Sequence, residues 1–297
     1  MSWKEAIVSI AESELKEGID LSSYTTFKLK AIGDVLEVHS VNALKKILPK
    51  LVENKKPYRV VGWGANQVLP DQSDFLFIKL QIPFDHQTYL SELRAEYKLP
   101  ASLGINHLTG HGSKFNLKGW EVFTGIPASL GGAIFMNAGT ALGEIGPLVK
   151  DVTLVTPDGQ ERIEIITPVS FSYRKNFFVK PGEVIVGATL IHQGVEQEIG
   201  PKIKNYLEYR KSTQPLATKN CGCVFKNASP FFQAGRLIDH LGLKGLSSGE
   251  LKVSPKHSNF MENTGGAKKE DFLRLVSVIN AYSDRYLGIE FELEVKI

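Results

Sequence analysis

The spacing of hydrophobic and polar residues predicts helices and strands that alternate through the first 80 residues. Apolar residues recur at helical spacing over 3–16 and again over 41–54, so both segments are predicted to be amphipathic helices. Between them the period changes to alternation, which predicts a strand pair around the turn at 32–34. Short apolar strands are predicted at 58–61 and 75–80. This order of elements is typical of an α/β or α+β domain.

The rest of the chain divides by the same criteria into a strand-rich part and a mixed C-terminal part. Two alternating runs flank the turn at 157–159 and predict a hairpin. Helical spacing returns at 201–210 and over 268–287, and the last nine residues alternate as a strand does. We therefore expect three segments, with the boundaries 1–84, 85–195 and 196–297.

The segment 119–139 is rich in glycine and carries no charge after Glu121. Its glycines are Gly119, Gly125, Gly131, Gly132 and Gly139. Ser129 precedes a short apolar run and is predicted to be a helix N-cap, where free N–H groups would form an anion site. One interpretation is that a flat or phosphorylated ligand lies against this backbone. The alternative is a tight turn packed against a neighbouring sheet.

A second glycine loop, Gly62-x-Gly64, follows the strand predicted at 58–61. It lacks the third glycine of a dinucleotide fingerprint, because position 67 is glutamine, and no acidic residue follows about 20 positions later. A Rossmann site is therefore not expected, and the absence of GxxxxGK[ST] excludes a P-loop. The loop is still suited to binding a ligand through main-chain N–H groups, with Asn66 just beyond it.

Charge and cysteine content narrow the function classes. The net charge of +3 over 297 residues, without a basic cluster, does not favour a nucleic-acid surface. The N-terminus lacks the apolar core of a signal peptide, and no apolar run approaches the ~18 residues of a membrane span. Cys221 and Cys223 form neither a disulfide framework nor a zinc site, and His107 and His111 lack a third metal ligand. We expect a cytoplasmic protein with no metal, nucleic-acid or membrane partner.

Seven stretches, in the same order over most of the chain, resemble the UDP-N-acetylenolpyruvoylglucosamine reductases of bacterial cell-wall synthesis. They are VVGWGANQVL, GWEVFTGIPASLGGAIFMNAG, FSYRKNFF, STQPLATKNCGCVFKN, AGRLIDHLGLKG, VSPKHSNFMEN and FELEVKI. The resemblance, to the shorter subtype of the family, implies an α+β FAD-binding fold of the vanillyl-alcohol-oxidase (PCMH) type. In that fold the subdomains 1–84 and 85–195 would clasp FAD, and 196–297 would bind the substrate.

The resemblance assigns both glycine loops to non-covalently bound FAD. The implied residues are Gly62, Trp63, Gly64, Ala65, Asn66, Gly125, Ile126, Pro127, Ser129, Gly131, Gly132, Asn137 and Gly139. NADPH would reduce the flavin, and flavin N5 would pass a hydride to UDP-N-acetylglucosamine enolpyruvate. The product would be UDP-N-acetylmuramate for peptidoglycan synthesis, on which cell shape and division depend. The partners implied are small molecules only, and the protein is expected to be a monomer.

Three catalytic residues carry over from the family. Arg174 would bind and polarise the enolpyruvyl carboxylate, and Glu294 would assist charge stabilisation or proton delivery. The serine that donates a proton in the family is Cys223 here, and a thiol with an unperturbed pKa near ~8.5 can still donate at neutral pH. The implied substrate contacts are Tyr173, Gln214, Lys226, Asn227, His257 and Asn259.

Two other functions stay open from the sequence. The same fold could serve an FAD-dependent alcohol oxidase or dehydrogenase, against which the combination of Arg174, Cys223 and Glu294 argues. The cysteine at position 223 also leaves open a non-catalytic flavin- or nucleotide-binding relative. Activity on the enolpyruvyl substrate would separate the three.

Overall fold

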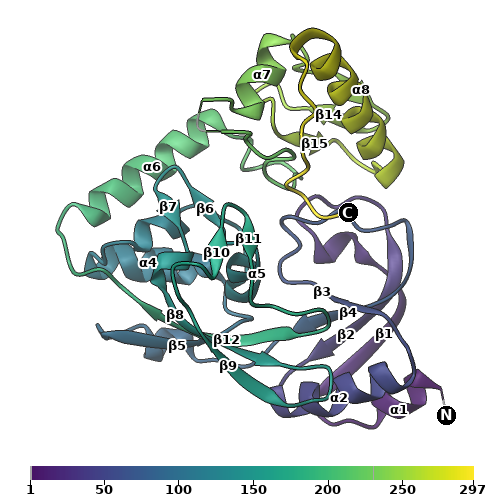
Figure 1. The fold of residues 1–297 in the computed structure, drawn as a ribbon, viewed down its shortest axis with the longest axis vertical. Coiled ribbons are helices and arrows are strands. Elements are labelled where there is room, and N and C mark those ends of the chain that lie inside the picture. Colours follow the sequence, from purple (N-terminus) through teal and green to yellow (C-terminus); the bar gives the residue numbers. More distant parts are fainter. Residues whose placement is uncertain (1, 230) are drawn as a thin grey trace. The chain divides into compact units, whose positions relative to one another are not determined.

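The computed structural model describes residues 2–229 and 231–297, which form two compact units (Figure 1). The first unit holds the chain up to Glu17, Asp34–Gly62 and Asp74–Glu208. The second holds Gly18–Gly33, Trp63–Ser73 and Tyr209–Ile297. Two short early segments therefore belong with the C-terminal part of the chain. The division into three segments stays a prediction.

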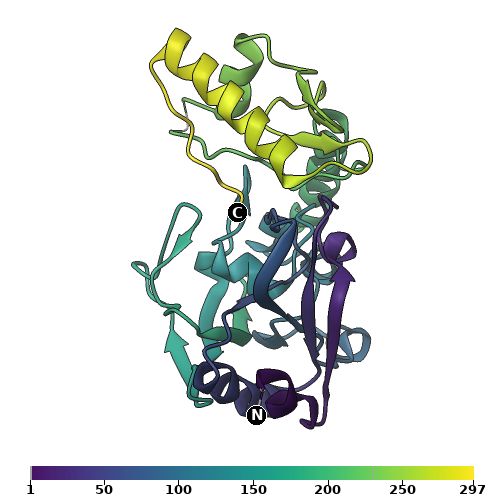
Figure 2. The same cartoon turned by 90° about the vertical axis from the view of Figure 1, so that its right-hand side faces the viewer.

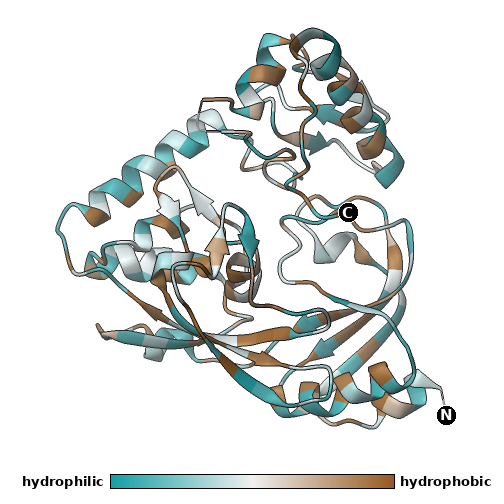
Figure 3. Cartoon of the chain, in the orientation of Figure 1, coloured by the Kyte–Doolittle hydropathy of each residue, from teal (hydrophilic) through white to brown (hydrophobic). Residues whose placement is uncertain are grey.

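The first sheet begins near the N-terminus and has the strand order β1-β2-β4-β3. Its strands are β1 (Ser13–Asp20), β2 (Ile32–Val38), β4 (Gln72–Leu80) and β3 (Tyr58–Val60), and β3 and β4 are parallel. The helices α1 (Trp3–Val8) and α2 (Val41–Glu53) pack against each other. Figure 3 shows the apolar side of α2, where Leu44, Ile47, Leu48 and Leu51 are buried. The helix predicted over 41–54 is thus confirmed.

The helix predicted over 3–16 is wrong beyond Val8. The chain leaves α1 at Ser9 and enters β1 at Ser13. The charged residues that fitted a helical face serve a strand instead, because Lys16 on β1 pairs with the buried Glu37 on β2 at 2.9 Å. Of the strand pair predicted around 32–34, the second strand is confirmed as β2, whereas the turn and the first strand are wrong, since β2 already begins at Ile32.

The second sheet lies wholly in the first unit and is antiparallel, in the order β5-β12-β8-β9. Its strands are β5 (Glu96–Pro100), β12 (Val184–Ile191), β8 (Val149–Val155) and β9 (Glu161–Ile165). The hairpin predicted around 157–159 is confirmed by β8 and β9, whose register pairs Val155 with Glu161. Buried aromatic residues, including Tyr97, Trp120 and Phe123, fill the core beside this sheet.

Short elements complete the first unit and carry its candidate site. The helices are α3 (His86–Tyr89), α4 (Ile105–Phe115) and α5 (Leu130–Phe135), with 3-10 turns at Trp120–Phe123 and Gly146–Leu148. Two small hairpins pair β6 (Gly139–Thr140) with β7 (Gly143–Glu144), and β10 (Phe171–Ser172) with β11 (Lys175–Asn176). The helix α6 (Ile199–Thr213) covers the segment predicted at 201–210 and continues past Glu208 into the second unit.

The second unit is built on a three-stranded antiparallel sheet, β13 (Ser247–Ser248), β14 (Leu251–Val253) and β15 (Met261–Asn263). The long helix α8 (Lys269–Leu287), predicted over 268–287, packs against β13 and β14 (Figure 2). A 3-10 turn (Leu21–Tyr24) and α7 (Ala234–His240) complete the regular elements of this unit. Among the described residues, no helix combines the length and apolar character that crossing a membrane requires.

The last nine residues, predicted as a strand, form single bridges rather than a named strand. Leu293 bridges Phe225 in antiparallel fashion, and Lys296 bridges Gln67 in parallel fashion. Phe27 and Leu29, which were predicted to alternate in a strand, are buried in the core of the second unit without one. There the amide of Asn263 donates to the carbonyls of Phe27 and Lys28, so a side chain replaces the missing ladder.

Candidate functional site

The loop 62–66 offers a run of backbone donors. The N–H groups of Gly62, Trp63, Gly64, Ala65 and Asn66 have no acceptor among the residues that the structure describes. Their carbonyls are partly engaged: Gly62 O accepts from Lys79 Nζ at 2.6 Å, and Gly64 O accepts from Thr26 N at 3.4 Å. Successive unpaired backbone N–H groups of this kind form a concave site for anions. Such a run of donors is suited to an anionic group such as a phosphate.

Lys79 adds a positive charge beside this loop. Its side chain is half-buried on β4, and burial lowers the pKa of the ammonium group, while the charge of Glu37 opposes the shift. A lysine bonded to the carbonyl of Gly62 holds the loop and contributes a favourable charge for an anion. Sequence reasoning did not single it out.

The start of α5 differs from the expectation. Ser129 is the N-cap as predicted, and its hydroxyl accepts from Gly132 N at 3.4 Å. However, Leu130 N donates to Leu103 O at 2.8 Å, and Gly131 N donates to Ala101 O at 2.9 Å. The prediction that this first turn presents free N–H groups is therefore wrong. The backbone around Gly131 is packed so tightly that a Cβ there would lie 2.8 Å from the Ala101 Cβ, which agrees with the alternative of a tightly packed turn.

Arg174 occupies the two-residue turn of the β10–β11 hairpin, with a positive φ of 55°. Its Nη2 donates to Gly139 O at 3.1 Å, and its Nη1 lies 3.8 Å from Glu144 Oε1. The guanidinium also lies over the ring of Tyr173, with Cζ 4.8 Å from the ring centroid. Residues held at a positive φ without being glycine are uncommon and often functional. The geometry thus presents a fixed, mostly buried cation.

Asn137 connects this arginine to the end of α5. Its Nδ2 donates to Glu144 Oε2 at 2.7 Å and to Ser172 O at 3.0 Å, and its Oδ1 accepts from Gly146 N at 3.0 Å. The side chain is 1% exposed. Both amide protons are used within the protein and the backbone N–H donates to Ile134 O at 3.0 Å, so the predicted contact of Asn137 with the cofactor would have to be made by an oxygen acceptor.

In the second unit, backbone hydrogen bonds join the segment 223–226 to two other segments, one at Asn259 and one at Glu294. Val224 N donates to Asn259 O at 2.8 Å on one side, and Glu294 N donates to Val224 O at 2.8 Å on the other. Asn259 is buried and bonds both backbone groups of Phe225, with Oδ1 accepting at 2.9 Å and Nδ2 donating at 2.8 Å. The structure therefore brings together the backbone of two predicted catalytic residues, Cys223 and Glu294, and one predicted substrate contact.

The same unit joins Glu294 to the glycine loop. Asn66 Nδ2 donates to Glu294 O at 3.1 Å, and Lys296 N donates to Asn66 O at 3.0 Å. Cys221, two residues before the predicted proton donor, is fully buried. Burial raises the pKa of the Cys221 thiol far above its usual range, and negative charge on Cys223 or Glu294 adds to the shift. Cys221 is therefore held as a neutral thiol, whereas Cys223 is partly exposed.

The remaining predicted substrate contacts have local partners. Lys226 forms an ion pair with Glu292, Gln214 Oε1 accepts from Arg210 Nε at 2.8 Å, and Asn227 Oδ1 accepts from Ala234 N at 3.1 Å. His257 is half-buried, and burial lowers the pKa of its imidazole. All four lie in the second unit, whereas Tyr173 and Arg174 lie in the first. Their roles in substrate binding stay predictions.

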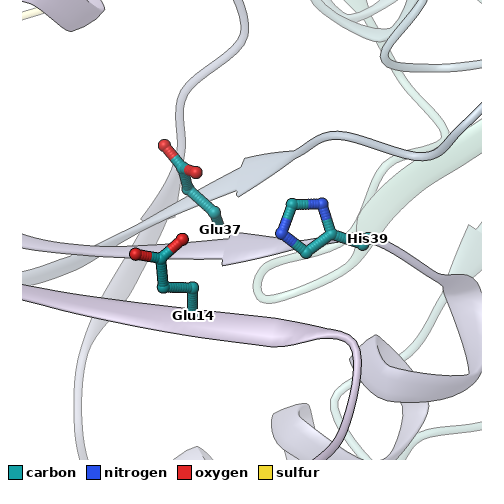
Figure 4. A group of neighbouring side chains, drawn as sticks. All are labelled: Glu14, Glu37 and His39. Atoms are coloured by element: carbon teal, nitrogen blue, oxygen red, sulfur yellow. The ribbon is translucent and has the colours of Figure 1, made fainter.

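Two histidines set aside as metal ligands have structural surroundings. His111 is buried, with Nδ1 2.8 Å from Leu90 O and Nε2 2.9 Å from Tyr97 Oη. The His107 ring lies against that of His86, tilted by 44° with 3.9 Å between the ring centroids. Among the described residues, the cluster that could hold a metal is instead Glu14, Glu37 and His39 on and beside β1 and β2 (Figure 4). Lys16 already forms ion pairs with both carboxylates, 2.9 Å from Glu37 and 3.8 Å from Glu14.

Comparison with known proteins gives the site a context. A profile described as the C-terminal domain of UDP-N-acetylenolpyruvoylglucosamine reductase matches residues 214–297. The enzyme of that name from Halalkalibacterium halodurans is 31% identical over 99% of this chain and 97% of its own. The one from Chlamydia pneumoniae is 30% identical over 99% of this chain and 95% of its own.

A solved structure agrees with these sequence matches. The crystal structure of UDP-N-acetylenolpyruvylglucosamine reductase (MurB) from Thermus caldophilus superposes with a TM-score of 0.78 at 30% identity. The match covers 96% of this chain and 98% of that one. It confirms the predicted α+β fold of the reductase family.

Proposed function

Because this chain belongs to the UDP-N-acetylenolpyruvoylglucosamine reductase family, we propose that it is an FAD-dependent oxidoreductase that uses NADPH to reduce UDP-N-acetylglucosamine enolpyruvate. The product is UDP-N-acetylmuramate, a precursor in peptidoglycan synthesis. The observation that carries the proposal is the end-to-end match with named reductases. The cytoplasmic location and the monomeric state go with this proposal as predictions.

The first requirement of the proposed chemistry is to hold FAD. When bound, FAD takes up a hydride from NADPH and delivers it to the enolpyruvyl group. The unpaired N–H groups of the loop 62–66 would hold its diphosphate, with the Lys79 ammonium adding charge. Tight packing of Gly131 against Ala101 would hold the start of α5 in place within the segment 125–139 that the proposal assigns to FAD.

At the enolpyruvyl group, the proposed reaction requires a cation, a carboxylate of the protein and an acid. Arg174 would bind the enolpyruvyl carboxylate, on which negative charge grows as the hydride arrives. A guanidinium fixed at a turn and stacked on Tyr173 needs little reorganisation to do so. Cys223 Sγ would then give its proton to the remaining carbon, and Glu294, on the paired segment, would stabilise charge or return the proton.

An anaerobic absorbance titration tests the proposal. NADPH should bleach the flavin band of the purified protein, and UDP-N-acetylglucosamine enolpyruvate should restore it. UDP-N-acetylglucosamine, which lacks the enolpyruvyl group, is the matched control and should restore nothing. Restoration by neither compound would contradict the proposal, and a protein without a flavin band after addition of FAD would remove it.

A further inference from the structure

The cation predicted to bind the substrate carboxylate is held by a chain of polar contacts that no sequence motif singled out. Arg174 lies on the β10–β11 turn, whereas its partners Gly139 and Glu144 lie opposite each other across the β6–β7 hairpin. The Gly139 carbonyl oxygen accepts a hydrogen bond from Nη2 of the guanidinium, and the Glu144 carboxylate lies near Nη1. Arg174 is therefore docked on one small hairpin by two groups at once.

The Glu144 carboxylate is oriented by Asn137. Asn137 Nδ2 bonds Glu144 Oε2 at 2.7 Å, which leaves Oε1 facing Arg174. The second proton of the same amide bonds Ser172 O, directly before the turn that carries Arg174. A further amide, Asn176 Nδ2, ties the other strand of that hairpin to Phe135 O at 2.8 Å. Both hairpins are thus fixed to the end of α5 through side-chain amides.

The Arg174–Glu144 contact is weak enough that Glu144 does not prevent Arg174 from binding a substrate carboxylate. At 3.8 Å it is an ion pair without a short hydrogen bond, and the Glu144 side chain is 35% exposed. Such partly solvated pairs contribute little net stability, so the pair with Glu144 adds only a small cost when a carboxylate binds the guanidinium. A close bidentate pair would compete with the substrate for the same fork of donors.

We propose that Glu144, oriented by Asn137, is a positioning residue that presents Arg174 to the carboxylate of the enolpyruvyl substrate. This rests on the proposed function, in which Arg174 binds that carboxylate. Glu144 touches neither reacting carbon nor cofactor in this scheme. It acts through the direction and rigidity of the guanidinium. Its loss should therefore reduce only what the enolpyruvyl group contributes to binding and to the second half-reaction.

Binding to the oxidised holoenzyme gives a readout that does not depend on turnover. Calorimetry would compare UDP-N-acetylglucosamine enolpyruvate with UDP-N-acetylglucosamine for wild type, Glu144→Gln and Glu144→Asp. We expect Glu144→Gln to reduce the affinity advantage of the enolpyruvyl compound about tenfold, because the guanidinium is no longer held in the direction of the substrate carboxylate. Affinity for the parent sugar should stay within twofold, and Glu144→Asp, which keeps the carboxylate, should recover part of the advantage.

Glu121→Gln is the matched control. Glu121 is also a carboxylate of the first unit, buried where Glu144 is partly exposed, and its oxygens accept from Gly119 N at 2.7 Å and from Lys202 Nζ at 2.7 Å rather than from Arg174. In stopped-flow, Glu144→Gln should slow substrate-driven recovery of the flavin band about tenfold and leave its bleaching by NADPH unchanged, whereas Glu121→Gln should change neither.

Three results would overturn the inference. Glu144→Gln could keep the full enolpyruvyl advantage, or Glu121→Gln could lose it equally, which would show a general effect of stability. In the third, the wild-type enzyme itself shows no enolpyruvyl advantage and no recovery of the flavin band. That result identifies a failure of the proposed function, and the inference falls with it.

Discussion

Gly62 lies against the side chain of Ser129, so close that a Cβ at position 62 would overlap the Ser129 hydroxyl oxygen. Both residues lie in the first unit. Gly62 is the last residue of the stretch Asp34–Gly62, shortly after β3, and Ser129 is the N-cap of α5. Glycine at position 62 thus has a steric cause independent of any ligand, and it places the first backbone donor of the loop beside the start of a helix.

Gly62→Ala is therefore expected to displace the Ser129 hydroxyl from its cap position. The loss of the cap should lower the free energy of unfolding by about 1 kcal/mol and weaken FAD binding, measured by denaturant titration and by quenching of flavin fluorescence. Gly110→Ala is the control, because a Cβ within α4 at that position meets nothing within 4 Å. Equal FAD affinity in wild type and Gly62→Ala would contradict the role of this contact.

Ser129→Ala provides a second test of the same contact. Removing the hydroxyl relieves the overlap, so the double variant Gly62→Ala/Ser129→Ala should lose less stability than the sum of the two single changes. Additive losses, measured by urea unfolding of all four proteins, would mean that the alanine methyl group clashes with something other than the Ser129 hydroxyl.

The regular spacing of apolar residues was enough to predict the helices and strands that pack one face against a hydrophobic core. The helices at 41–54 and 268–287 and the hairpin around 157–159 follow from local spacing, because burial acts on each of them along its whole length. The segment 9–16 was predicted wrongly because its charges fit a helical face and a strand equally well. Only the cross-strand partner Glu37, distant in sequence, decides between them.

The residues of the candidate site that belong to a sequence motif could be predicted, whereas the contacts that only the fold brings together could not. Arg174, Cys223 and Glu294 were named through the family resemblance. The occupied N–H groups of α5 depend on acceptors at Ala101 and Leu103, which no local pattern reveals. Glu144 was missed for the same reason, since its link to Arg174 exists only once two separate hairpins meet.

Asn259→Asp should destabilise the segment that carries Cys223. The buried amide of Asn259 both donates to and accepts from the backbone of Phe225, and an ionised carboxylate cannot donate. We expect a loss of about 1–3 kcal/mol in the free energy of unfolding, measured by urea titration. Asn280, half-buried, makes the same pair of bonds to Phe291, so Asn280→Asp is the control and should cost less. Equal losses would contradict an effect of burial.

Cys223→Ala should stop proton delivery without affecting hydride uptake. Substrate-driven recovery of the flavin band is expected to slow by about 10²- to 10⁴-fold, the usual contribution of a general acid, while bleaching by NADPH continues. Cys223→Ser restores the family's donor and should keep the reaction. Cys221→Ala is the matched control, because that thiol is fully buried and held protonated. A wild-type rate in Cys223→Ala would exclude the thiol as the acid.

The buried His111 should make stability depend on pH. Burial lowers the pKa of its imidazole, and the positive charges of Lys114 and His192 contribute further, against the hydrogen bond to Leu90 O. The folded protein therefore keeps the ring neutral, while the unfolded chain takes up a proton below its ordinary pKa of about 6.5. Stability from this site is full above that pH and is lost as the pH falls toward the lower pKa of the folded state, by at most about 1.4 kcal/mol per pH unit.

Urea unfolding between pH 8 and pH 5 measures this effect as the slope of the free energy of unfolding against pH. The slope should be shallower for His111→Gln than for wild type, whereas the exposed control His240→Gln should retain the wild-type slope. Parallel slopes for wild type and His111→Gln would show that protonation of this ring does not contribute.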